Sequence, residues 1–325
     1  MCPNPSGKTV SAANIPEEVT IAPVVAQRGG AWAAWRNLPG PQRARLGGFT
    51  GYLVVLTLLF IQPLTMLMLH AAQSYLQSYI LLVPFISGYL LYIRRGRLLT
   101  AYRRSIPGTV TVGGIGIAIL AAGIGWHGSL SVNDELTLMA LAYVSFLSAG
   151  GFLFLGSKWM GAAAFPISFL IFMVPLPDAA VIWLEDASAS ASADAAALYF
   201  NVLGTPLVRH GRVFELPGIV LQVAQECSGI HSSLVLFLTS LIGSQLFLRT
   251  WWGRIALVAF VIPLGILRNG FRILVIGLLC VHLGPQMINS SIHRHGGPIF
   301  FALSLVPLFL LLLWLRRQEP KNLPG

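Results

Sequence analysis

Residues 255–282 read IALVAFVIPLGILRNGFRILVIGLLCVH, an apolar stretch with the polar residues Arg268, Asn269 and Arg272 near its middle. A helix needs about 20 apolar residues to cross the hydrocarbon core of a bilayer, and this stretch is long enough. Charged side chains are unfavourable at such depth, so where they occur they are candidates for function. The stretch therefore predicts a transmembrane helix that carries functional residues.

Similar apolar stretches recur along the whole chain. Of the 325 residues, 55% are hydrophobic and 10% are charged, whereas a soluble domain has about 25% charged residues. We therefore predict an all-α integral membrane protein, surrounded by membrane lipid, with about eight transmembrane helices and a small external helix and hairpin insertion. The other seven predicted spans are 49–69, 75–93, 109–126, 136–156, 159–175, 229–248 and 297–315.

The basic residues predict how the chain is oriented, because Lys and Arg gather in cytoplasmic loops. If both termini are cytoplasmic, 16 of the 21 Lys and Arg residues lie on the cytoplasmic side. All acidic residues except Glu17, Glu18 and Glu319 then lie on the other side. We expect a multi-pass protein of the cytoplasmic (inner) membrane. The net charge of +10 comes from clusters between spans, which argues against nucleic-acid binding.

The domain organisation follows from these spans. Residues 1–47 are polar, lack a signal peptide and predict a disordered cytoplasmic leader. Residues 48–316 form the transmembrane domain, and 317–325 form a cytoplasmic tail. The longest external segment is 176–227, where Pro175 and Pro177 end the fifth span. In it, 178–201 predict a helix along the outer interface, and 205–223 predict a small hairpin that leads to Cys227.

Three polar groups occur after residue 220. Glu226-Cys227-Ser228-Gly229 opens the sixth span, and a cysteine at a helix N-terminus has a lowered thiol pKa. Asn269 and Arg272 can share one face of the seventh span. Arg272 lies about 27 Å along the helix from Arg254, and so near the outer interface; a helix break at Asn269-Gly270 would shift this depth. His293-Arg294-His295-Gly296-Gly297 precedes the last span.

These groups meet at one membrane depth in the predicted topology. A thiol, an imidazole and a fixed cation form a complete set for acyl transfer. Each group also has an ordinary explanation: a helix cap at Ser228-Gly229, an arginine that extends to the surface at Arg272, and solvated histidines. Arg268 is the arginine more suited to a structural role. No second cysteine or carboxylate pair has the spacing of a metal site, so we expect no metal and no cofactor.

The chain resembles the exosortase/archaeosortase family of polytopic membrane transpeptidases. The family pattern has an A/E-C-S-G element, then N-x-x-R in the next span, then H-x-x-x-G before a final span. Here these are Glu226-Cys227-Ser228-Gly229, Asn269-x-x-Arg272 and His293-x-x-x-Gly297, and the likeness covers roughly residues 50–315. Ser78-Tyr79 and Pro298 depart from the family pattern.

The resemblance implies a cysteine peptidase/transpeptidase at the outer face of the membrane. It implies Cys227 as nucleophile, His293 as general acid/base and Arg272 as transition-state stabiliser. Its substrates are exported proteins with a C-terminal tail of a recognition motif, a transmembrane helix and a basic cluster, cleaved through a thioacyl intermediate. Residues with supporting or substrate-binding roles are Glu226, Ser228, Arg268, Asn269 and His295; His295 is also an alternative to His293.

Two other functions are open from the sequence. A transporter or channel can line its path with Arg268, Asn269, Arg272 and His282, but these residues cluster at one interface whereas transporter sites lie near the midplane. A haem protein can use histidines as axial ligands, but no two histidines share a buried depth. The recognition motif, the acyl acceptor and the oligomeric state are not predicted.

Overall fold

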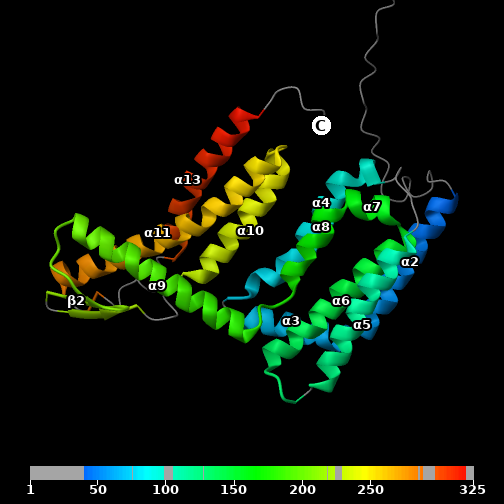
Figure 1. Cartoon of the computed structure of the whole chain (residues 1–325), viewed down its shortest axis with the longest axis horizontal. Helices are drawn as coiled ribbons and strands as arrows, with labels where there is room; N and C mark the ends of the chain where they lie inside the picture. The colour runs from blue at the N-terminus through cyan, green and yellow to red at the C-terminus, as the bar shows by residue number, and fades with distance from the viewer. Residues whose placement is uncertain are drawn as a thin grey trace, which may run out of the picture. The chain divides into compact units, whose positions relative to one another are not determined.

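The computed structural model describes residues 40–74, 76–98, 105–126, 128–217, 219–223, 229–284, 286–287 and 297–319, without the side chains of 95–98. The chain divides into two compact units, Met1–Ala44 and Arg45–Gly325. Of the first unit, only residues 40–44 are described, and they begin helix α2. The second unit holds every other element described below (Figure 1).

The elements are almost all helical. Before residue 175 they are α2 (Gly40–Leu59), α3 (Ile61–Gln73), the 3-10 helix η1 (Ser78–Leu82), α4 (Val83–Leu98), α5 (Ile106–Gly125), α6 (Val132–Phe154), α7 (Ser157–Ala162), α8 (Ala164–Phe169) and the 3-10 helix η2 (Leu170–Met173). After it they are α9 (Asp178–Val202), strands β1 (Val208–His210), β2 (Val213–Leu216) and β3 (Ile219–Gln222), α10 (Ile230–Phe247), α11 (Trp251–Leu283) and α13 (Gly297–Gln318).

Among the described residues, five helices are long and apolar enough to cross a membrane: α5, α6, α10, α11 and α13. The number rises to seven if two bent pairs each count as one span. These pairs are α2 with α3, bent by 71°, and residues 164–173 with α9, bent by 91°. The predicted second span is the shorter apolar helix Ser78–Arg94. The all-α membrane fold is confirmed, and the described residues hold five to seven candidate spans besides this shorter helix.

Proline explains why two predicted spans are divided. Pro63 follows Leu59, the last residue of α2, by four positions. Pro166 follows Ala162, the last residue of α7, by the same interval. Proline has no backbone N–H, so neither can donate the helical hydrogen bond to the carbonyl four residues earlier. The predicted first and fifth spans therefore each form more than one helix.

Between residues 178 and 223 the predicted helix and hairpin are both present. The helix, α9, agrees with the prediction to within one residue, and the strands form an antiparallel sheet in the order β1-β2-β3. Two ion pairs join the sheet to α9: Arg209 contacts Asp194 at 2.6 Å, and Arg212 contacts Asp186 at 2.7 Å. The hairpin therefore has a third strand, which ends just before the Cys227 segment.

Helix α11 is longer than a bilayer requires. Its 33 residues extend about 50 Å, whereas the hydrocarbon core is about 30 Å thick. It begins at Trp251 and Trp252, whose exposed rings contact each other at a tilt; tryptophan is typical of a membrane interface. It continues without a break through Asn269 and Gly270, so the break considered from the sequence does not occur.

The last third of α11 is covered by α9 and the sheet. In Figure 1, α9 runs alongside this part of α11, with the sheet beside their ends. One apolar cluster joins the three elements, and its buried members include Phe200, Phe214 and Ile273. A second cluster joins α10, α11 and α13. One side of this last third of α11 is thus buried within the protein.

The end of α13 is tied to the start of α11. An Oε1 atom of Glu319 accepts hydrogen bonds from the backbone N–H of Arg249 and Thr250 and from the Thr250 hydroxyl. Thr250 precedes the first residue of α11, so this carboxylate caps the helix. Burial raises the pKa of Glu319, but these hydrogen bonds and the Arg249 charge outweigh burial and leave the pKa below its usual value.

We expect Glu319→Gln to destabilise the protein by about 1 kcal/mol, as loss of a helix cap does. Because the pKa of Glu319 is lower in the folded state, its contribution is complete above the unfolded pKa of about 4.3 and is lost as pH falls toward the folded pKa. Thermal unfolding of the detergent-solubilised protein at pH 7 and pH 4 measures both effects. Glu215→Gln, at an exposed position of β2, is the control. Equal unfolding midpoints for the two variants at pH 7 would contradict the prediction.

Candidate active site

Gly229 begins α10 in a conformation that requires glycine. Its φ of 70° lies in the left-handed region, which disfavours residues with a Cβ atom. A Cβ atom added here would lie 2.8 Å from Oδ1 of Asn269 and 3.2 Å from Nη2 of Arg268. The residue next to Ser228 is therefore packed directly on the polar residues of α11.

Arg268 holds the start of α10 in place. Its side chain is buried, and Nη2 donates hydrogen bonds to the Gly229 carbonyl and to the Ser233 hydroxyl, both at 3.1 Å. The Ser232 hydroxyl donates to the same carbonyl at 2.9 Å. Gly265, one turn before Arg268, lies so close to α10 that a Cβ atom there would be 2.8 Å from Ser233 Oγ. These contacts make Arg268 a link between α10 and α11.

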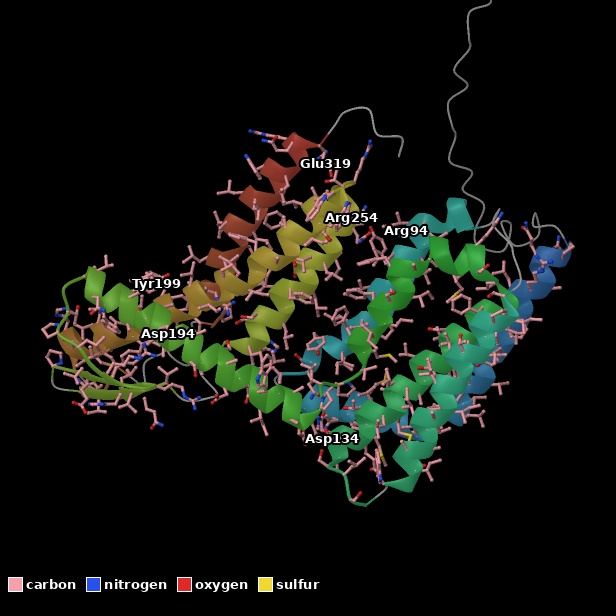
Figure 2. The ribbon with its side chains drawn as sticks, in the orientation of Figure 1. Arg94, Asp134, Asp194, Tyr199, Arg254 and Glu319 are labelled. Atoms are coloured by element: carbon pink, nitrogen blue, oxygen red, sulfur yellow. The ribbon has the colours of Figure 1, made fainter. Side chains whose placement is uncertain are left out.

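Phe271 and Arg272 lie on the next turn of α11, where two other helices approach. The ring of Phe271 packs edge-on against Phe300 of α13, with a centroid distance of 6.2 Å, and against Tyr199 of α9, at 6.4 Å. The Tyr199 hydroxyl donates to the Leu267 carbonyl at 3.3 Å; Tyr199 is labelled in Figure 2. The start of α10, the middle of α11 and the start of α13 therefore meet in one region.

A buried hydrogen-bond network lies beside the start of α10. His231, in the first turn of α10, hydrogen bonds through Nδ1 to the Leu76 carbonyl at 3.3 Å. Next to Leu76, the Gln77 amide donates to Asn133 at 3.0 Å. Asn133 donates in turn to the Leu176 carbonyl and to the Asp178 carboxylate, each at 2.8 Å. The network joins η1, α6 and the start of α9 to the start of α10.

The structure places three of the predicted site residues. Arg268 and Asn269 are buried on α11, and Arg272 is half-buried one turn further along. The remaining predicted residues lie outside the described part of the chain: Glu226, Cys227, Ser228, His293 and His295. Within the described part, no three His, Cys, Asp or Glu side chains come together in a way that could hold a metal ion.

Sequence reasoning did not identify His231, Ser233 or Gly265. Ser233 and Gly265 look like ordinary small residues of apolar helices, and only the α10–α11 contact gives them a role. His231 follows Cys227 by four positions, the spacing of one helical turn. That spacing is a signal that could have identified it.

We expect Gly229→Ala to lower the thermal unfolding midpoint, because the new methyl group adds backbone strain and a clash with Asn269. The expected loss is about 1–3 kcal/mol, the usual range for strain or overpacking. Gly243→Ala on α10 is the matched control, since nothing lies within 4 Å of a Cβ atom there. Unfolding of both variants in the same detergent checks the prediction, and a Gly229→Ala protein as stable as Gly243→Ala would contradict it.

Comparison with known proteins identifies the family of the chain. The sequence model of the family described as transmembrane exosortase (Exosortase_EpsH) matches residues 71–310. This range covers most of the chain and includes all of α10 and α11. No curated protein and no solved structure matches the chain. The chain is a multi-pass membrane protein of the transmembrane exosortase family, whose members are membrane transpeptidases that act in sorting exported proteins.

Proposed function

We propose that this exosortase cleaves the C-terminal sorting signals of exported proteins by cysteine catalysis at the outer face of the cytoplasmic membrane. Cys227 is the nucleophile, His293 the general acid/base and Arg272 the transition-state stabiliser. The substrate's C-terminal tail consists of a recognition motif, a transmembrane helix and a basic cluster. The contact of Gly229 with Arg268 and Asn269 is the observation that carries this proposal.

Chain connectivity supports the grouping of these residues. Cys227 precedes Gly229 by two positions, so its Cα atom is within about 7.6 Å of the Gly229 Cα atom. Gly229 in turn contacts the α11 residues one turn before Arg272. His293 precedes Gly297, the first residue of α13, by four positions. The first turn of α13 packs on Phe271, the residue next to Arg272.

The reaction proceeds in two acyl transfers. The Cys227 thiolate attacks the scissile carbonyl carbon, and the charge that develops on the carbonyl oxygen is stabilised by the Arg272 guanidinium. The C–N bond then breaks, the leaving amine takes a proton from the His293 imidazolium, and a thioester remains on Cys227. An amine or water gives up a proton to His293 and attacks the thioester, which releases the product and regenerates the thiolate.

Supporting roles fall to the neighbouring polar residues. Asn269 holds the start of α10 through its contact with Gly229. Glu226, Ser228 and His295 are next to or near the catalytic residues in sequence, and we assign them to contacts with the substrate motif. Family membership favours this enzyme over a transporter or channel.

The charge pattern supports the outer-face assignment. Figure 2 shows Arg94, Arg254 and Glu319 toward one edge of the view and Asp134 toward the opposite edge. The first three belong to the predicted cytoplasmic side, and Asp134 belongs to the external side. The start of α10 hydrogen bonds to Leu76, next to the network that includes Asn133, and so it belongs to the Asp134 side.

We expect Cys227→Ala and Cys227→Ser to abolish processing of an exported protein that ends in such a tail, because no thioester can form. Arg272→Ala should slow processing about 10²- to 10³-fold, and His293→Ala about 10²- to 10⁴-fold. Immunoblots of the co-expressed substrate measure the cleaved fraction. Cys280→Ser, in the buried part of α11, is the control.

Membrane abundance of each variant is measured in parallel, so that loss through misfolding is recognised. Normal processing by Cys227→Ala would refute the cysteine mechanism. Normal processing by His293→Ala, with loss in His295→Ala, would instead assign the acid/base role to His295.

The orientation of the chain in the membrane can be tested separately. Single cysteines at the exposed positions Ser129, between α5 and α6, and Lys158, in α7, should behave oppositely toward a membrane-impermeant maleimide in cells with an accessible outer face. With native cysteines replaced, we expect labelling of Ser129→Cys, and of Lys158→Cys only after the membrane is opened. The reverse pattern would place the active site on the cytoplasmic side.

A further inference from the structure

An apolar groove lies at the bend between α2 and α3. It has a volume of about 350 Å³, and its walls come from α2, α3, η1, α4, α6 and η2. Helices α2 and α3 meet there at 71°, and residues from both sides of the bend line the groove, among them Thr57, Ile61 and Leu64. The groove is therefore part of the helix break that accompanies Pro63.

The groove lies at membrane depth and opens toward lipid. Tyr143 and Leu147 form part of its wall, and both are near the middle of α6, a candidate membrane span. Ile61 and Met68 line it from α3 and are 53% and 54% exposed. In a multi-pass membrane protein, such exposed apolar side chains face the hydrocarbon of the bilayer. The groove thus continues the lipid-facing surface into the protein.

The lining favours hydrocarbon over water. Among the described residues that line the groove none is charged, and those with hydroxyl groups are Thr57, Thr65 and Tyr143. The Thr57 hydroxyl donates to the Leu53 carbonyl at 2.8 Å and lies 3.1 Å from Tyr143 Oη. The Thr65 hydroxyl donates to the Gln62 carbonyl at 2.8 Å. A buried water needs about two to four polar partners, whereas these hydroxyls already have partners within the protein.

The size of the groove fits an extended chain. An apolar cavity of about 150 Å³ binds benzene, so a groove of about 350 Å³ accepts about a dozen carbon atoms. A helix with side chains is at least about 10 Å wide and rises about 5.4 Å per turn, so that one turn fills more than about 400 Å³. The groove is therefore too small to enclose one turn of a transmembrane helix, but it can enclose most of an acyl chain.

We propose that this groove is a lipid site whose occupant is an acyl chain of a bilayer phospholipid. The chain enters beside Ile61 and Met68 and lies against Tyr143 and Met173. It gives these side chains the van der Waals contacts that a void denies them. A free fatty acid is excluded as the source, because its carboxylate needs donors or a cation that the described lining does not supply.

One wall of the lipid site is η1. Ile80 and Leu81 line the groove, and Ile80 is buried. The carbonyl of Leu76, just before η1, hydrogen bonds to His231 in the first turn of α10. An acyl chain in the groove therefore supports the segment that holds the start of α10. The inference goes beyond the proposed function, since it requires neither catalysis nor a substrate.

The test uses the full-length protein in vesicles of dioleoyl phosphatidylcholine with a trace of phosphatidylcholine that carries a diazirine halfway along one chain. Light releases nitrogen from the diazirine, and the resulting carbene inserts into a neighbouring bond to hydrogen. Mass spectrometry then identifies the labelled residues.

We expect labelling of Tyr143 and Met173, which are only 8% and 7% exposed and which the groove makes accessible. Val144, also 7% exposed but outside the lining, should remain unlabelled. Ile117 of α5, which is 62% exposed, should be labelled like any lipid-facing residue and serves as the reference.

A variant that fills the groove provides the second part of the test. Leu64→Trp places an indole ring in the groove and should lower labelling of the two buried residues about tenfold or more, because the ring and the chain compete for the same space. Leu69→Trp is the matched control, since it makes the same change at a 64% exposed position of α3 outside the lining. Thr65→Trp makes the comparison if Leu64→Trp does not accumulate.

Three results would overturn the proposal. Unlabelled Tyr143 and Met173, with Ile117 labelled, would show that no acyl chain enters the groove. Labelling that Leu64→Trp and Thr65→Trp leave unchanged would show that the carbene reaches these residues by another route. Labelling that disappears when the exported substrate is reconstituted alongside the enzyme would assign the groove to the substrate's transmembrane helix. Failure of the proposed function is distinct from all three, because it appears as processing by Cys227→Ala.

Discussion

The contact of Gly229 with Arg268 and Asn269 is the constraint on which the rest of the site depends. The two helices approach so closely that no side chain fits at Gly229. A buried guanidinium then joins the first carbonyl of α10 to the middle of α11. Because α10 follows the Cys227 segment directly in sequence and both arginines are on α11, this contact joins the two helices that carry the proposed site.

Small residues also allow close helix packing further along α11. A Cβ atom at Gly270 would lie 2.7 Å from the Ala195 Cβ atom, and one at Gly277 would lie 2.6 Å from the Phe200 ring. Glycine on α11 and alanine on α9 thus bring the two backbones together. Small residues allow close helix packing of this kind in membrane proteins. The packing covers one side of the last third of α11 and supports the residues around Arg272.

The two ends of α10 are joined to the helices that precede α9. At one end His231 contacts the Leu76 carbonyl. At the other end Arg94 of α4 donates to Gln245 at 3.2 Å, and Phe237 packs edge-on against Phe172 between them. Buried polar contacts are directional, so they set the register of α10 more narrowly than apolar packing alone can. The helix that follows Cys227 is therefore held along its whole length.

The sequence by itself determined the membrane class and the positions of α5, α6, α10, α11 and α13, and it supplied the three polar groups that we propose as the site. The length of an apolar stretch and the placement of charged residues are local properties, and they can be recognised in the sequence without knowledge of the fold. It also predicted α9 and the hairpin, because proline, glycine and alanine act on their immediate neighbours. Only the tertiary structure decided that Pro63 and Pro166 divide two spans while Pro263 and Pro307 remain inside continuous helices. Whether a proline breaks a membrane helix depends on neighbours that compensate the lost hydrogen bond. The roles of Ser233, Gly265 and Arg268 were likewise set by the tertiary structure, because each depends on a helix distant in sequence, and local pattern carries no information about such contacts.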